Sequence, residues 1–139
     1  MKQRTPVSTI MTKNIIALTR SDDLERAEML FKRYNIKHIP VVSRDMIIGM
    51  LSYTDLMRIS YAETSSKADN KVESVVYNMF SIEQAMVKDV VTVSSDTTIK
   101  EVSKILAAQN FHSLPVVDND TLVGMVTTTD LLNYYVEQY

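Results

Sequence analysis

The chain has 139 residues, of which 45% are hydrophobic and 23% are charged, a composition typical of a globular chain that excludes a mainly disordered one. Its formal net charge is −2 without any block of like charges, which argues against nucleic acid and anionic membranes as partners. No apolar run approaches the roughly 20 residues of a membrane span. We therefore expect a cytoplasmic protein that does not insert into membranes.

The scarce residue types exclude several kinds of functional site. Cysteine is absent, which excludes thiol nucleophiles and cysteine-ligated metals. Two glycines are too few for a phosphate-binding glycine loop or a dinucleotide fingerprint. Two histidines, both in hydrophobic surroundings, are too few for a histidine-rich metal site. We expect no catalytic residues and no enzyme.

The first half of the chain predicts a strand, a helix, a hairpin and a second helix. Residues 15–18 form a short apolar, β-branched run that suits a brief strand. Behind Asp23, apolar residues recur at helical spacing, at Leu24, Ala27, Leu30 and Phe31. Residues 39–42 and 46–52 predict an antiparallel hairpin, and another helix begins near residue 53.

A connecting segment follows. Residues 61–70 are polar and weakly patterned, so we expect a mobile linker there. An amphipathic helix is expected next, packed on the domain's own core, because apolar residues recur at Val72, Val75, Val76, Met79 and Phe80.

The second half predicts the same elements in the same order. Residues 90–93 suit a brief strand, and Thr98 and Glu101 have the spacing of a capping box. The helix behind this cap has an apolar stripe formed by Ile99, Val102, Ile105 and Leu106. Residues 114–117 and 121–127 predict a hairpin, and a final helix begins near residue 128.

The two halves are copies of one sequence. Gly49 and Gly124 lie 75 positions apart (124 − 49), and at this offset residues 39–42 align with 114–117 and residues 49–56 with 124–131. This duplication predicts an α/β fold of two tandem β-α-β-β-α repeats with pseudo-twofold symmetry. We expect a first repeat over residues 1–60, a linker and connecting helix over 61–80, and a second repeat over 81–139.

Each repeat ends in a hydroxyl and a carboxylate three residues apart, Ser52 with Asp55 and Thr127 with Asp130. At a helix start this pair suits two roles. The free amides and partial positive charge of a helix N-terminus favour a phosphate, and the carboxylate can accept hydrogen bonds from ribose hydroxyls. The same spacing is that of a capping box, which needs no ligand, and the spacing alone favours the cap.

The paired Pro-Val-Val strands and Gly-x-x-Ser/Thr-x-x-Asp-Leu endings resemble a tandem CBS-domain pair, or Bateman module, and this resemblance covers nearly the whole chain. It implies two α/β units with two ligand clefts between the halves. It also implies that the repeated endings contact the ribose and phosphate of an adenosine ligand. The ligand-binding residues carried over on this basis are Thr12, Ile16, Lys37, His38, Ser52, Thr54, Asp55, Val87, Val91, His112, Ser113, Thr127, Thr129 and Asp130.

Within this set, Thr12, Ile16, Val87 and Val91 correspond to adenine-holding positions. Val87 stands where the first repeat has the hydroxyl of Thr12, so we expect two unequal sites. A solvent-facing or core-edge role stays open for His38 and His112, which differ by one position in the repeat register. Thr54 and Thr129 suit an accessory hydroxyl or an exposed helix position.

The resemblance implies a freestanding regulatory, energy-sensing module. It would bind AMP, ADP, ATP or S-adenosylmethionine and signal occupancy to an unknown regulated protein. We expect a homodimer, because the helices that contain Leu56 and Met57, and Leu131 and Leu132, lack cover in a single pair. The alternative is a ligand-free interaction or scaffold module of the same fold, in which the repeated endings only cap helices.

Overall fold

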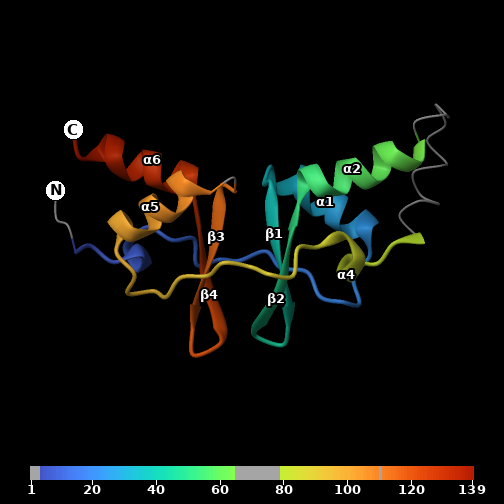
Figure 1. Ribbon diagram of the computed structural model, residues 1–139, viewed down its shortest axis with the longest axis horizontal. Coiled ribbons are helices and arrows are strands. Elements are labelled where there is room, and N and C mark those ends of the chain that lie inside the picture. The colour runs from blue at the N-terminus through green and yellow to red at the C-terminus, as the bar shows by residue number, and fades with distance from the viewer. Residues whose placement is uncertain (1–3, 65–78, 110) are drawn as a thin grey trace. The chain divides into compact units, whose positions relative to one another are not determined.

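The computed structural model describes residues 4–64, 79–109 and 111–139, and its long helices and hairpins follow the predicted order twice (Figure 1). The two final helices begin at Tyr53 and Thr128, as the sequence predicts. The elements are η1 (Val7–Thr9), α1 (Leu24–Tyr34), β1 (His38–Ser43), β2 (Met46–Ser52), α2 (Tyr53–Thr64), α4 (Ile82–Ala85), α5 (Ile99–Ala108), β3 (Ser113–Asp118), β4 (Thr121–Thr127) and α6 (Thr128–Glu137).

The chain folds into two compact units that exchange their leading segments. Ile16–Val90 form the first-hairpin unit, which contains β1 and β2. Met1–Ile15 join Val91–Tyr139 in the second-hairpin unit, which contains β3 and β4. The segment ahead of each repeat is therefore part of the other repeat's unit. The domain limits expected from the sequence stay a prediction.

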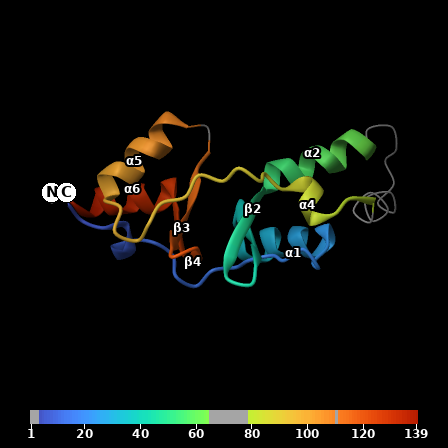
Figure 2. The ribbon, with the colours of Figure 1, turned by 60° about the horizontal axis from the view of Figure 1, so that its bottom comes forward.

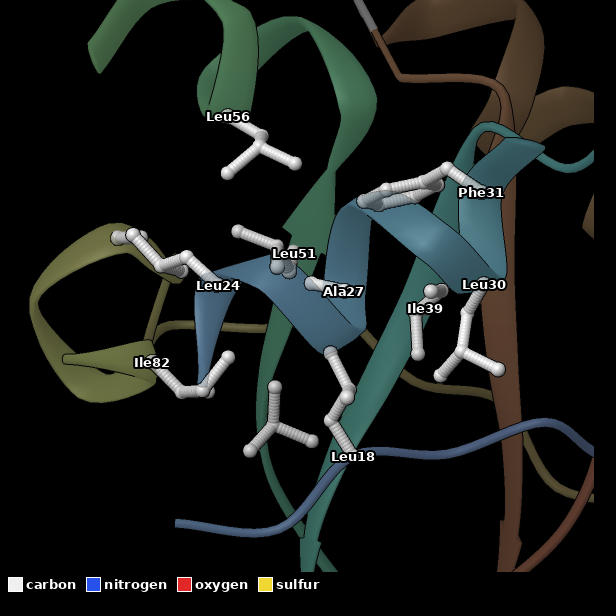
Figure 3. Close-up of a cluster of buried hydrophobic side chains, with 11 residues drawn as sticks. Leu18, Leu24, Ala27, Leu30, Phe31, Ile39, Leu51, Leu56 and Ile82 are labelled. Atoms are coloured by element: carbon white, nitrogen blue, oxygen red, sulfur yellow. The ribbon is translucent and has the colours of Figure 1, made fainter. Parts of the chain in front are cut away.

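The first-hairpin unit packs α1, α2 and α4 on one side of an antiparallel hairpin (Figure 2). Its core joins the apolar stripe of α1 to the inner face of the hairpin, because both bury large aliphatic side chains. Leu24, Ile39, Leu51 and Leu56 are all fully buried there, and Ile82 of α4 closes the cluster (Figure 3).

The second-hairpin unit repeats this packing. Val102 of α5, Leu114 and Val126 of the hairpin and Leu131 of α6 are buried in one cluster. Val7 of η1 completes the cluster, held by a 2.7 Å hydrogen bond from its amide to the carbonyl of Thr97. A residue from the chain's beginning thus fills the core of the second repeat.

The brief strands expected at 15–18 and 90–93 are shorter than predicted. Each is reduced to a parallel bridge, Leu18 with Val41 and Val93 with Val116. The chain turns away directly afterwards, since the amide of Thr19 donates to the Asp22 carboxylate at 2.8 Å. These local hydrogen bonds compete with a longer ladder.

The predicted helix caps are confirmed, although Thr98 and Glu101 form only the hydroxyl half of the expected capping box. The Asp23 carboxylate accepts the amide of Arg26 at 2.8 Å, and the Thr98 hydroxyl accepts the amide of Glu101 at 3.1 Å. Each satisfies one of the amides left free at a helix start.

The two glycines permit a close approach of the exchanged segments. A β-carbon on Gly49 would overlap the Met86 sulfur, and one on Gly124 would lie 2.6 Å from the Met11 sulfur. Neither glycine has a positive φ, so contact and not backbone conformation requires glycine here.

Two features of the connecting segment lie largely outside the described residues. Residues 61–64 of the expected linker belong instead to α2. The rest of the linker and the helix through Val72, Val75 and Val76 fall outside the described residues, while Phe80 packs against the first-hairpin core. Among the helices that are described, none has the length and apolar character to cross a membrane.

Candidate functional site

Each unit brings a strand start and a helix start together. The Lys37 carbonyl accepts the amide of Tyr53, the first residue of α2, at 2.9 Å. The His112 carbonyl accepts the amide of Thr128, the first residue of α6, also at 2.9 Å. The candidate residues before β1 and β3 therefore lie beside the repeated endings.

In the second-hairpin unit, Thr127 and Asp130 form a complete capping box. The Thr127 hydroxyl accepts the amide of Asp130 at 3.1 Å, and the Asp130 Oδ2 accepts the amide of Thr127 at 2.9 Å. The predicted capping role of Thr127 and Asp130 is therefore confirmed. It leaves the Asp130 carboxylate with further lone pairs, because a carboxylate can accept about four hydrogen bonds.

The first-hairpin unit has the same hydroxyl cap but another partner for its carboxylate. The Ser52 hydroxyl accepts the amide of Asp55 at 3.0 Å. In the described part of the chain, the Asp55 Oδ1 pairs instead with Arg58 Nη1 at 3.2 Å. Their side chains are 25% and 73% exposed, so this ion pair is open to solvent and contributes little stability.

Ser113 is the unusual polar residue of the site. It is 6% exposed, and its hydroxyl has no hydrogen-bond partner among the described residues. The hairpin register places it directly opposite Thr127, so the two side chains lie on one face of the hairpin. A buried hydroxyl without a partner is costly, which makes Ser113 a candidate to bind a ligand group. Its counterpart His38 is half-buried opposite Ser52.

Thr12 and Val87 each lie in the unit that contains the hairpin of the other repeat. Thr12 forms an antiparallel bridge with Met125, through backbone hydrogen bonds of 2.7 and 2.9 Å. Val87 forms the same bridge with Met50, through two hydrogen bonds of 2.9 Å. Thr12 therefore lies in the unit of Thr127, while Val87 lies in the unit of Ser52. Sequence reasoning assigned each to its own repeat and missed this exchange.

The remaining candidates lie at different depths. Ile16 is half-buried and packs against the first-hairpin core, whereas its counterpart Val91 is exposed in the other unit. Thr54 and Thr129 are exposed on the first turns of α2 and α6. Met11 and Met86 lie against the repeated glycines, Met11 at Gly124 and Met86 at Gly49. They were not among the predicted site residues, although they lie 75 positions apart (86 − 11), as the two glycines do.

Metal binding has no assembled site in the ranges described. No group of three or more His, Cys, Asp or Glu side chains there is arranged to hold a metal ion. Hydrogen bonds from the Ser95 hydroxyl and amide lower the pKa of Asp118, the last residue of β3 before the hairpin turn. That carboxylate fixes a turn and lies at the opposite end of the hairpin from Ser113.

Comparison with known proteins agrees with the duplicated architecture. The family model for the CBS domain matches residues 7–62 and again residues 82–137. The chain belongs to the CBS-domain family. It is a CBS-domain pair, as the repeated endings predict.

Solved structures share this fold over almost the full chain. The CBS domain pair of protein MJ0100, in complex with 5′-methylthioadenosine and S-adenosyl-L-methionine, has a TM-score of 0.78 at 23% identity, and covers 97% of this chain and 98% of that one. CBSX2 in complex with AMP has a TM-score of 0.79 at 19% identity, with coverages of 96% and 98%.

Curated relatives include longer proteins. A homoserine O-acetyltransferase of Methanococcus vannielii is 32% identical over 129 residues, which are 91% of this chain and 24% of that protein. The chain spans between 23% and 45% of the length of four such relatives. The similarity to these proteins is therefore a similarity to their CBS-like part.

Proposed function

We propose that this CBS-domain pair is a regulatory module that binds an adenosine ligand at the starts of α2 and α6 and transmits occupancy to a partner protein. The candidate ligands are AMP, ADP, ATP and S-adenosylmethionine. The carrying observation is the repeated arrangement of a hydroxyl, a carboxylate and a strand-start residue, which brings Ser52 and Asp55 beside Lys37, and Thr127 and Asp130 beside His112. No catalytic residue is assigned.

The chemistry of these groups fits a nucleoside. Asp55 and Asp130 offer carboxylate oxygens to the paired hydroxyls of a ribose, and hydrogen bonds to a charged group are stronger than neutral ones. The bridges of Thr12 and Val87 place backbone and apolar groups in the same units. The relatives crystallised with 5′-methylthioadenosine, S-adenosylmethionine and AMP support this ligand class.

Calorimetric titration with AMP, ADP, ATP and S-adenosylmethionine tests the proposal. We expect saturable binding of at least one of them. GMP is the matched control, because it shares ribose and phosphate with AMP and differs in the base. Absence of binding by all four ligands would refute the proposal.

A ligand-free scaffold is the second candidate, and the Thr127–Asp130 capping box favours it. Both halves of the box are satisfied within the protein, so these two residues have a structural role without any ligand. The same titration separates the candidates. A protein that binds no adenosine ligand and still associates with its partner is a scaffold.

We further propose that the module is a homodimer. Leu56 and Leu131 are buried in their own units, contrary to the expectation that they lack cover. The apolar side chains that remain exposed on α6 are Leu132 at 61% and Val136 at 71%, four residues apart and therefore on one helix face. Association of two copies through such a face would remove it from water.

A further inference from the structure

The starts of α2 and α6 differ in charge. The exposed Lys37 lies beside the first residue of α2, and the exposed Arg58 lies one turn further along, next to Asp55. At the 75-residue offset, Lys37 corresponds to His112 and Arg58 to Asn133. The first-hairpin unit thus has two cations at its helix start where the other unit has a histidine and an amide.

The backbone does not compensate for this difference. Two of the first three amides of α2 are already bonded, Tyr53 to Lys37 and Asp55 to Ser52. In α6, Thr128 is bonded to His112 and Asp130 to Thr127 in the same way. The first-turn amides are therefore used alike in both units, and the side-chain cations are what distinguishes the units toward a phosphate. Lys13 and Lys88 occupy equivalent positions and do not distinguish the units.

The second-hairpin unit offers uncharged donors in place of cations. The Ser113 hydroxyl is nine-tenths buried, has no partner in the described structure, and faces the capping hydroxyl of Thr127 across the hairpin. Beside these two hydroxyls lies the carboxylate of Asp130. A carboxylate repels an anion and can accept a hydrogen bond from a ribose hydroxyl. A neutral polar ligand pairs Ser113 without burying an uncompensated charge.

We propose that the second-hairpin unit binds an adenosyl ligand without a phosphate, through Ser113 and Asp130, and that a phosphorylated ligand binds the first-hairpin unit through Lys37 and Arg58. This inference rests on the proposed function and assigns a ligand class to each unit. The probes are AMP, which carries a phosphate, and 5′-methylthioadenosine, which is uncharged and has the same adenosine group.

The test uses the full chain and two variants. Lys37→Gln/Arg58→Gln should weaken AMP binding at least about tenfold, because charge-assisted contacts are lost, and should change 5′-methylthioadenosine binding less than about twofold. Ser113→Ala should weaken 5′-methylthioadenosine binding about fivefold and leave AMP binding unchanged. Its ligand-free Tm should not fall, because the hydroxyl that is removed has no partner.

A matched control removes two charges elsewhere. Lys100→Gln/Lys104→Gln changes α5, and both affinities should stay within about twofold of the parent. Loss of both ligands in the Lys37/Arg58 variant, or no loss of 5′-methylthioadenosine binding in Ser113→Ala, overturns the inference and leaves the proposed function intact. Binding of AMP alone by the parent overturns it equally. A parent that binds no adenosyl ligand refutes the proposed function itself.

Discussion

Replacing Asp130 or Asp55 by Ala should have unequal effects on stability, although the two residues are repeat counterparts. Asp130→Ala removes the acceptor of the Thr127 amide, a 2.9 Å hydrogen bond in a half-buried setting. It also removes a negative charge from a helix start. We estimate a loss of about 1–2 kcal/mol from an unpaired amide and the lost helix-dipole interaction.

Asp55→Ala should cost less. It removes the same helix-dipole interaction and an exposed ion pair with Arg58, which contributes about 0–1 kcal/mol, while the amide of residue 55 keeps the Ser52 hydroxyl. At about 4 °C for each kcal/mol in a chain of this size, the Tm should fall by about 4–8 °C in Asp130→Ala and by a smaller amount in Asp55→Ala, which leaves no amide unpaired.

Thermal unfolding followed by circular dichroism, without ligand, measures both values. Adenosine-ligand affinity is measured on the same samples below the transition. The ligand-site proposal requires at least about a tenfold loss of affinity in one variant while it remains folded. Equal Tm shifts, or a larger shift in Asp55→Ala, would contradict the assignment of the capping box to Asp130. Unchanged affinity in both variants would leave capping as the sole role.

Three further predictions follow from contacts described above. Gly124→Ala should destabilise the protein by about 1–3 kcal/mol, because the new β-carbon overlaps the Met11 side chain, and Met11→Ala in the same chain should restore part of the loss in a urea titration. Ser95 lowers the pKa of Asp118 in the folded protein, so the ionised Asp118 carboxylate stabilises the fold. This stabilisation is complete above the pKa of Asp118 in the unfolded chain and is lost as the pH falls through its pKa in the folded protein. Asp118→Asn should therefore make unfolding less sensitive to acid, and parallel acid titrations of parent and variant would argue against this. Leu132→Glu should shift the protein from dimer to monomer in light scattering at micromolar concentration, and a monomeric parent would refute the dimer.

Local sequence patterns predicted most of the secondary structure. Asp23 and Thr98 cap α1 and α5 as expected, because capping depends on a side chain and an amide three residues away. The hairpins follow the alternation and turn signals of residues 38–52 and 113–127. The brief strands were overestimated, since their short apolar runs do not reveal the turn that ends each after one bridge.

The residues of the candidate site were predictable from the repeated motif. The hydrogen-bond and ion-pair partners of these residues were not. The spacing of Thr127 and Asp130 predicted both a cap and a site, and the reciprocal hydrogen bonds show the cap. The pairing of Asp55 with Arg58 was not predicted, although their spacing of three residues in one helix permits it. Nor did the sequence reveal that the Ser113 hydroxyl is buried without a partner, because burial depends on everything packed around a residue.

The sequence by itself determined the duplication, the order of elements and the family, because these depend on local patterns and on their repetition at a fixed offset. The tertiary structure alone decided which hairpin each leading segment joins. Met11 and Met86 have the same local sequence role, and Gly124 and Gly49 offer equivalent surfaces, so either pairing satisfies the local pattern. Packing selects Met11 on Gly124 and Met86 on Gly49, and this exchange places Thr12 with Thr127 and Val87 with Ser52.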